Sequence, residues 1–188
     1  MSKIKNNPIL QKVTGMLGET IVFRRGPTGP VMANAPKKPE SLHANQVAAR
    51  DRFLDAVQYA KRQTAKDEVK AMYATGISRR LPSAYQVAVT DYLSVPKIKQ
   101  IDADAYQGGP GQVINVHASD DFKVDSVAVV IKSAAGEEIE RGQAMLTEDK
   151  RDVWLYTTTS ATPLLAGTTV TVSVRDIPGN LAIRTLTL

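Results

Sequence analysis

The sequence predicts an α+β protein with an extended N-terminal arm, a short helical region and a C-terminal β-sandwich. Three observations carry this prediction. Residues 1–40 are interrupted by Gly and Pro, residues 41–95 repeat apolar side chains at spacings of three and four, and residues 96–188 alternate apolar with polar side chains. The last two patterns are the periods of a helix and of a strand. We therefore expect three domains with these boundaries.

The arm is predicted to contain one β-hairpin. The segment ETIVFRR is typical of a strand, GPTG of a turn, and PVMANAP of a second strand that Pro30 and Pro36 confine to a sheet edge. A two-stranded ribbon is only marginally stable in water, so we expect its apolar side to lie against another surface. The residues expected to make that contact are Ile21, Val22, Phe23, Arg24 and Arg25.

Helices are predicted between residues 41 and 95. In the segment NQVAARDRFLDAVQYAKRQ, an apolar stripe at helical spacing includes Phe53, Ala56 and Ala60. Ser83 followed by Gln86 is typical of a capping box. The helix that begins there is expected to stop before Pro96.

Seven runs rich in β-branched residues follow, and each is predicted to be a strand. They are KIKQIDADAY, QVINVHASD, VDSVAVVIKSA, EEIERGQAML, VWLYTTT, TTVTVSVRD and LAIRTLTL, with turn residues between them. Seven strands at this spacing favour a seven-stranded immunoglobulin-like β-sandwich. Trp154, the one tryptophan, is expected to fill the space between its two sheets.

Two parts of the chain resemble known groups of proteins. The segments SDDFKVDSVAVVI and VSVRDIPGNLAIRTLTL resemble bacterial immunoglobulin-like domains, where a D-x-x-G-N turn such as Asp176 to Asn180 precedes the last strand. This resemblance implies the sandwich fold and a role as spacer, adhesive module or decoration on an assembly. The N-terminal half resembles a set of uncharacterised bacterial proteins with the pattern NPIL…G.LG..VFRR..G, then PKKP…Q…R.RF..A..YAK. That resemblance supports a division of the chain into an N-terminal and a C-terminal part, and it implies no activity.

The composition argues against catalysis. The chain has no cysteine, which removes disulfides, thiol nucleophiles and cysteine-bound zinc. Its two histidines, His43 and His117, lie in different kinds of segment, which disfavours a histidine-rich metal site. No nucleophile is spaced to pair with a base. We therefore expect a protein that is not an enzyme and that uses no cofactor.

Carboxylates in the predicted sandwich turns are candidate ligands for a calcium ion. Carboxylate oxygens are ligands that Ca²⁺ prefers, and loops at one end of a sandwich can bring them together. Asp is also a common turn residue without any metal, and that is the preferred interpretation. The four carboxylates are Asp120, Asp121, Asp125 and Asp176.

Charge is distributed unevenly along the chain. Residues 1–95 carry 15 Lys and Arg against 7 Asp and Glu, a net +8, whereas residues 96–188 carry 9 against 12, a net −3. This asymmetry favours either nucleic-acid binding at the basic end or attraction between copies. Besides the two arm arginines, the residues of a candidate basic patch are Lys3, Lys5, Lys12, Lys37, Lys38, Arg79 and Arg80. Aromatic residues are scarce among them, so a solvated basic face or pairing with acidic neighbours is preferred to nucleic-acid binding.

The function predicted from these features is that of a structural subunit in a homopolymeric assembly, such as a filament, a tube or a phage-like particle. The arm is expected to link neighbouring copies by adding strands to their sheets, with the sandwich facing outward. The alternatives are a nucleic-acid-binding protein and an adhesive or carbohydrate-binding module. The sequence contains no Sec signal and no apolar run of membrane-spanning length. We therefore expect synthesis in the cytoplasm without Sec export, and an extracellular assembly stays an open alternative.

Overall fold

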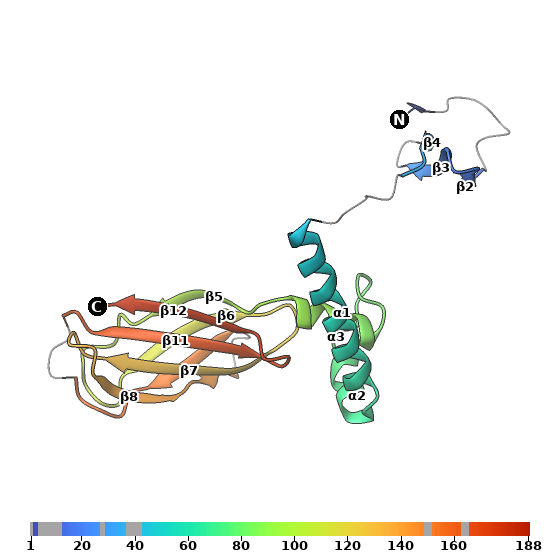
Figure 1. Ribbon diagram of the computed structural model, residues 1–188. Helices are drawn as coiled ribbons and strands as arrows, with labels where there is room; N and C mark the ends of the chain where they lie inside the picture. The colour runs from blue at the N-terminus through green and yellow to red at the C-terminus, as the bar shows by residue number, and fades with distance from the viewer. Residues whose placement is uncertain (1, 4–12, 27–28, 37–42, 149–151, 163–165) are drawn as a thin grey trace. The chain divides into compact units, whose positions relative to one another are not determined.

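The computed structural model describes residues 2–3, 13–26, 29–36, 43–148, 152–162 and 166–188. These residues contain three helices and three four-stranded sheets, which confirms the α+β class (Figure 1). The chain divides into two compact units, residues 1–47 and residues 48–188. The predicted boundary at residue 40 lies outside the described residues, and the one at residue 95 falls inside the second unit, so the three-domain division stays a prediction.

The first unit contains a sheet that we call the arm sheet. Its strands are β1 (Ser2–Lys3), β2 (Gly15–Leu17), β3 (Ile21–Gly26) and β4 (Gly29–Asn34), in the order β1-β4-β3-β2. The predicted hairpin is present, because β3 and β4 pair antiparallel from Ile21 opposite Asn34 to Gly26 opposite Gly29. Residues 27 and 28, in the middle of the predicted turn, lie outside the described residues.

The prediction of a two-stranded ribbon is wrong, because β1 and β2 extend the hairpin on both sides. These two strands have only two and three residues. An alternating pattern of apolar and polar residues needs a longer run to be recognised. The sequence therefore contains no clear signal for either strand.

The helical part of the second unit has a small core of its own. Its helices are α1 (Ala44–Thr64), which begins before the boundary between the units, α2 (Asp67–Ala74) and α3 (Ala84–Leu93). Ser83 caps α3 as predicted, since its Oγ accepts a hydrogen bond from the backbone N–H of Gln86 at 3.3 Å. The buried residues of this core are Tyr59, Ala60, Tyr73, Ala84, Val87 and Ala88.

The first half of α1 is mostly exposed, although Arg52 donates a hydrogen bond to the backbone carbonyl of Leu93 at 3.1 Å. Residues 51–55 are all exposed, and Phe53 and Leu54 keep 50% and 49% of their surface in solvent. The prediction that Phe53 is buried is therefore wrong, whereas Ala56 and Ala60 are buried as predicted. The reason is length, because α1 has 21 residues and its partners α2 and α3 have 8 and 10. Periodicity identifies an apolar face but not how much of it another helix covers.

Two four-stranded sheets form the rest of the second unit (Figure 1). One sheet has the order β5-β6-β10-β9 and the other β12-β11-β7-β8, with all pairings antiparallel. The strands are β5 (Lys97–Asp102), β6 (Val113–Ser119), β7 (Val124–Lys132), β8 (Glu138–Gln143), β9 (Met145–Leu146), β10 (Val153–Thr157), β11 (Thr169–Asp176) and β12 (Leu181–Thr187).

These are eight strands where seven runs were expected, because the run EEIERGQAML divides between the sheets. Its first part, β8, pairs with β7, whereas its second part, β9, pairs with β10 of the other sheet. Ala144 lies at the crossing, where it is buried and its backbone N–H donates to the Val127 carbonyl at 2.8 Å. The other six runs each contain one strand.

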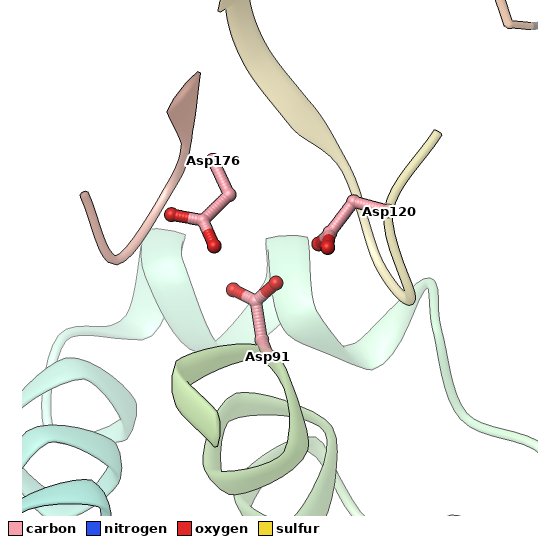
Figure 2. A group of neighbouring side chains, drawn as sticks. All are labelled: Asp91, Asp120 and Asp176. Carbon is pink, nitrogen blue, oxygen red and sulfur yellow. The ribbon is translucent and has the colours of Figure 1, made fainter. Parts of the chain in front are cut away.

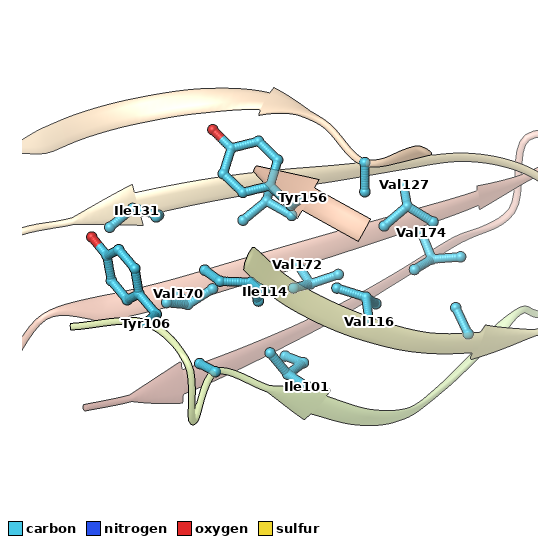
Figure 3. Packing of buried hydrophobic residues seen from close by; sticks show 14 residues of the cluster. Ile101, Tyr106, Ile114, Val116, Val127, Ile131, Tyr156, Val170, Val172 and Val174 are labelled. Atoms are coloured by element: carbon cyan, nitrogen blue, oxygen red, sulfur yellow. The ribbon is translucent and has the colours of Figure 1, made fainter. Parts of the chain in front are cut away.

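The inward faces of the two sheets share one core (Figure 3). Alternate residues of β6, β7 and β11 are fully buried, as the period of a strand requires. The aromatic rings inside this core are Tyr106 and Tyr156, each 3% exposed. Trp154 lies on the inward face of β10, opposite the buried Val116, and packs against the core as predicted, but it is only partly buried.

Candidate functional site

Three carboxyl groups meet where α3 approaches both sheets of the second unit (Figure 2). Asp91 comes from α3, Asp120 from the loop after β6, and Asp176 from the end of β11. One oxygen of each lies within 4.8 Å of one oxygen of each other. Asp91 and Asp176 are 0% and 1% exposed, and Asp120 is partly buried. We call this group the carboxyl cluster.

A tight turn holds Asp176 in the cluster. Its Oδ1 accepts hydrogen bonds from the backbone N–H groups of Gly179 at 2.8 Å and Asn180 at 2.6 Å. Gly179 has a φ of +100°, a conformation that side chains other than hydrogen rarely allow. This is the D-x-x-G-N segment of the sequence, and the turn explains its Asp, Gly and Asn residues.

The same turn ties the sandwich to the end of α3. The side-chain amide of Asn180 donates to Oδ2 of Asp176 and to the backbone carbonyl of Ser94, both at 2.7 Å. It also lies 3.2 Å from the carbonyl of Tyr92. Carbonyls at the end of a helix have no partner within it, so Asn180 supplies one.

A chain of two tyrosines positions Asp91. The hydroxyl of Tyr73 on α2 donates to Oδ2 of Asp91 at 2.8 Å, and the hydroxyl of Tyr59 on α1 lies 2.9 Å from that of Tyr73. Since Tyr73 gives its hydrogen to Asp91, Tyr59 donates to Tyr73. The other oxygen, Oδ1 of Asp91, is buried without a hydrogen-bond partner, and so is Oδ1 of Asp120.

Burial raises the pKa of Asp91 to about 8, since an ionised carboxylate loses its hydration inside the protein. The nearby Asp120 and Asp176 raise the pKa of Asp91 further, and the hydrogen bond from Tyr73 opposes this. Burial also raises the pKa of Asp176, against the lowering effect of its hydrogen bonds from Asn180 and Gly179. Without a cation Asp91 therefore holds a proton at neutral pH, and Asp120 is within hydrogen-bonding reach of that proton.

In the presence of a chelator that removes any divalent cation, the free energy of unfolding is expected to fall as the pH rises from about 4 to about 8. The pKa of Asp91 is 3.8 in a free carboxyl and about 8 in the folded chain, so the folded state binds more protons in this interval. The stabilisation is complete below the lower value and is lost as the pH rises through the upper one, by on the order of a few kcal/mol. Urea unfolding at a series of pH values measures it.

The variant Asp91→Asn is the control for this pH dependence, since the amide keeps the size of the side chain and does not titrate. The groups that face Asp91 are Tyr73, Tyr59, Asp120 and Asp176, and they remain in the variant. Its stability should vary less with pH than that of the wild type. Equal slopes in the two proteins between pH 4 and 8 would contradict the prediction.

The structure brings together two of the four predicted calcium candidates. Asp121 turns away from the cluster, and its Oδ2 accepts a hydrogen bond from Ser94 Oγ at 2.6 Å. Asp125 is exposed on β7. Asp91 was missed, although one signal was available: it lies on the same helical face as Val87 and Ala88, which are buried. A charged residue on an apolar helical face indicates a buried polar group.

The arm residues predicted for assembly lie on β3. Ile21, Val22 and Phe23 are partly buried, and Arg24 and Arg25 are exposed. The predicted basic patch stays a prediction, because its described members belong to two separate units. Arg79 and Arg80 are exposed between α2 and α3 in the second unit, and Lys3 lies on β1 in the first. The remaining predicted members, Lys5, Lys12, Lys37 and Lys38, lie outside the described residues.

Comparison of the chain with protein-family models, curated proteins and solved structures gave no match. In the part of the chain that the structure describes, no helix has both the length and the apolar character needed to cross a membrane. The resemblances stated from the sequence therefore stay predictions.

Proposed function

We propose that the protein is a non-enzymatic structural subunit of a homopolymeric assembly, such as a filament, a tube or a phage-like particle. The arm sheet of one copy binds a neighbouring copy by strand addition, and an immunoglobulin-like sandwich faces outward. The observation that carries this proposal is the exposure of the arm sheet. Among its described side chains none is buried, and both buried clusters found among the described residues belong to the second unit.

Apolar side chains lie on both faces of the arm sheet, since Val22 pairs with Met16 and Ala33 on one of them. The other face carries Ile21 and Phe23 beside the polar Arg25 and Asn34, and we call it the apolar face. Residues directly opposite each other in an antiparallel pair share a face. Phe23 lies opposite Met32 of β4, and Ile21 lies opposite Leu17 of β2. Because side chains alternate along a strand, Ile21 and Phe23 also share a face. Leu17 keeps 64% of its surface in solvent. A second protein surface on this face would remove these four side chains from water.

The edge strand β2 makes strand addition available. It pairs with β3 on one side and is the last strand of the sheet on the other. An unpaired edge presents backbone donors and acceptors that another chain can use. Strand addition through such groups places few demands on sequence. The edge therefore supports a contact between identical copies.

The charges support a second copy as the occupant of this surface. Residues 1–47 carry 7 Lys and Arg against 2 Glu, which equals the net +5 of the whole chain. Residues 96–188 have a net charge of −3. Complementary charge on separate parts of a chain attracts copies to each other. On α1, the exposed Phe53 and Leu54 add apolar surface that a neighbour would cover.

The strand order supports the immunoglobulin-like part of the proposal. Constant-type immunoglobulin domains have sheets ABED and CFG. If β5, β6, β9 and β10 are named A, B, D and E, the order β5-β6-β10-β9 is ABED. The order β12-β11-β7-β8 then corresponds to GFC with one extra edge strand. In the family that the sequence resembles, such domains serve as spacers or decorations.

Nucleic acid is the second candidate partner, because the first unit carries the entire net positive charge of the chain. Cationic side chains bind phosphate backbones without reading sequence. Strand β3 contributes Arg24 and Arg25 as an exposed adjacent pair. The binding of wild-type protein to duplex DNA is therefore measured alongside its assembly.

Light scattering and negative-stain microscopy over a concentration and salt series test the assembly. We expect wild-type protein to form particles or filaments, and the double variant Arg24→Glu with Arg25→Glu to assemble less at low salt. Added salt should reduce this difference, since exposed charges are screened over about 8–10 Å at ordinary ionic strength. The matched control is Arg79→Glu with Arg80→Glu, an exposed arginine pair in the second unit, which should assemble like the wild type.

Two results would contradict the proposal. The first is a wild-type protein that stays monomeric at every concentration. The second is an equal loss of assembly in both double variants, which would indicate a response to net charge alone. A wild-type monomer that shifts duplex DNA, with the shift abolished by the Arg24 and Arg25 substitutions, would place nucleic-acid binding first.

A further inference from the structure

We propose that Asp91, Asp120 and Asp176 form a calcium-binding site that joins helix α3 to both sheets of the second unit. Asp120 follows β6 of one sheet, and Asp176 ends β11 of the other. One ion bound by all three would cross-link the helical part of this unit to the two layers of the sandwich. The inference is independent of the proposed assembly.

The first support is an unpartnered oxygen aimed into the cluster. Asp91 is fully buried, and its Oδ1 accepts from no donor among the described residues, although Tyr73 donates to Oδ2. Asp120 can hydrogen-bond to Asp91 only when one of the two carboxyl groups carries a proton. Figure 2 shows the Asp91 carboxyl group pointing from α3 toward the space between Asp120 and Asp176. Buried polar atoms are nearly always paired, so an exception requires an explanation. A cation between the three groups explains the orphaned oxygens of both Asp91 and Asp120.

The second support is the absence of a compensating positive charge. None of the salt bridges among the described residues reaches the cluster. The groups that influence Asp91 are tyrosine and carboxyl groups. Ionising carboxyl groups that are buried together is costly without a counter-charge. A divalent cation would supply that charge at the point where the three side chains converge.

The spacing and chemistry of the oxygens fit calcium. Calcium binds oxygen at 2.3–2.6 Å, so two of its ligands can be as far apart as about 5 Å. The three oxygens lie within 4.8 Å of one another, which fits this limit. Magnesium binds at about 2.0–2.1 Å, which limits two ligands to about 4 Å, and it gives up its water reluctantly. All the ligands are carboxylate oxygens, the type that these hard cations prefer.

Asp120 also lines a cavity of about 380 Å³ together with Phe122, Lys123, Asp152 and Trp154, among others. Asp91 and Asp176 do not line this cavity, so Asp120 is the member of the cluster that borders it. Calcium takes six to eight oxygen ligands, so oxygens besides those of the three carboxyl groups would complete its shell.

The competing explanation is a proton shared between Asp91 and Asp120, which calorimetric titration can separate from a metal site. Full-length protein treated with chelator is titrated with calcium chloride near neutral pH, and thermal unfolding is followed with and without the ion. We expect saturable binding of one calcium ion and a higher unfolding temperature in its presence. The dissociation constant should fall between about 10⁻⁷ and 10⁻³ M, the range of sensor and extracellular calcium sites.

The variant Asp91→Asn should weaken calcium binding at least about tenfold, because ligand charge sets calcium affinity. The amide preserves the size of the side chain, and Tyr73 can still donate to its oxygen. Asp125→Asn is the matched control, since it removes the same charge from an exposed position on β7. Its calcium binding should equal that of the wild type. If circular dichroism shows that Asp91→Asn does not fold, Asp120→Asn decides in its place.

Three outcomes would overturn the inference. Absence of binding in wild-type protein up to about 10 mM calcium, above the weakest class of calcium sites, would leave the shared proton as the explanation. Equal losses of affinity in Asp91→Asn and Asp125→Asn would indicate diffuse attraction of the ion to acidic surface. Equal stabilisation by magnesium and calcium would contradict the assignment of the site to calcium.

Discussion

Replacing Tyr73 with alanine is expected to lower the free energy of unfolding by about 3–5 kcal/mol, toward the upper end of that range. Tyr73 is the largest fully buried side chain among the described residues. Its ring stacks on Phe122 with centroids 4.9 Å apart, which connects α2 to the loop between β6 and β7. The substitution leaves a cavity at this contact and also removes the donor to Asp91. Urea unfolding followed by circular dichroism measures the loss.

Two further variants separate the ring of Tyr73 from its hydroxyl. Tyr73→Phe keeps the stacking and removes the donor, which should cost about 1–3 kcal/mol because a buried acceptor loses its partner. The control is Tyr85→Phe in the same core, where the hydroxyl makes no hydrogen bond with a described residue and the expected change is smaller. A loss below about 1 kcal/mol for Tyr73→Ala would contradict the packing, since deleting a buried aromatic ring costs several times more.

Phe23→Asp is expected to abolish assembly. Phe23 lies in the middle of the apolar face of the arm sheet, beside Met32 and next to Ile21 on the same side. A carboxylate there would lose its hydration against a neighbouring copy, without a partner for its charge. Sedimentation velocity and negative-stain microscopy measure this under conditions in which the wild type assembles. The variant should remain unassembled.

Thr20→Asp is the control for this variant. It adds the same charge at an exposed position in the turn between β2 and β3, outside the paired strands. It should assemble as the wild type does. Assembly of Phe23→Asp at the wild-type concentration would show that this face is not the contact between copies.

Much of the secondary structure could be predicted from the sequence because its elements are long and strongly periodic. Strands β6, β7 and β11 alternate buried and less buried residues over seven to nine positions. Helix α3 begins at the predicted cap, and the hairpin of β3 and β4 consists of the two predicted strands. These features depend on neighbours a few residues apart, whose chemistry is visible in the sequence.

The candidate site was predicted only in part, because its residues come from distant parts of the chain. Asp120 and Asp176 could be chosen as turn carboxylates, but their partner Asp91 lies on a helix in another predicted domain. Asp121 and Asp125 have the same local signal as Asp120 and do not join the cluster. Local chemistry cannot distinguish them, since a side chain one residue away can point in another direction.

The sequence by itself determined the α+β class, the location of the long strands and the Asp176 to Asn180 turn. Each follows from short-range rules, namely side-chain alternation and the backbone conformation available to glycine. Only the tertiary structure decided that the run containing β8 and β9 divides between two sheets, that Trp154 stays at the edge of the core, and that Phe53 is exposed. Those outcomes depend on which surfaces meet, and contact between distant surfaces is decided by the packing of the whole unit.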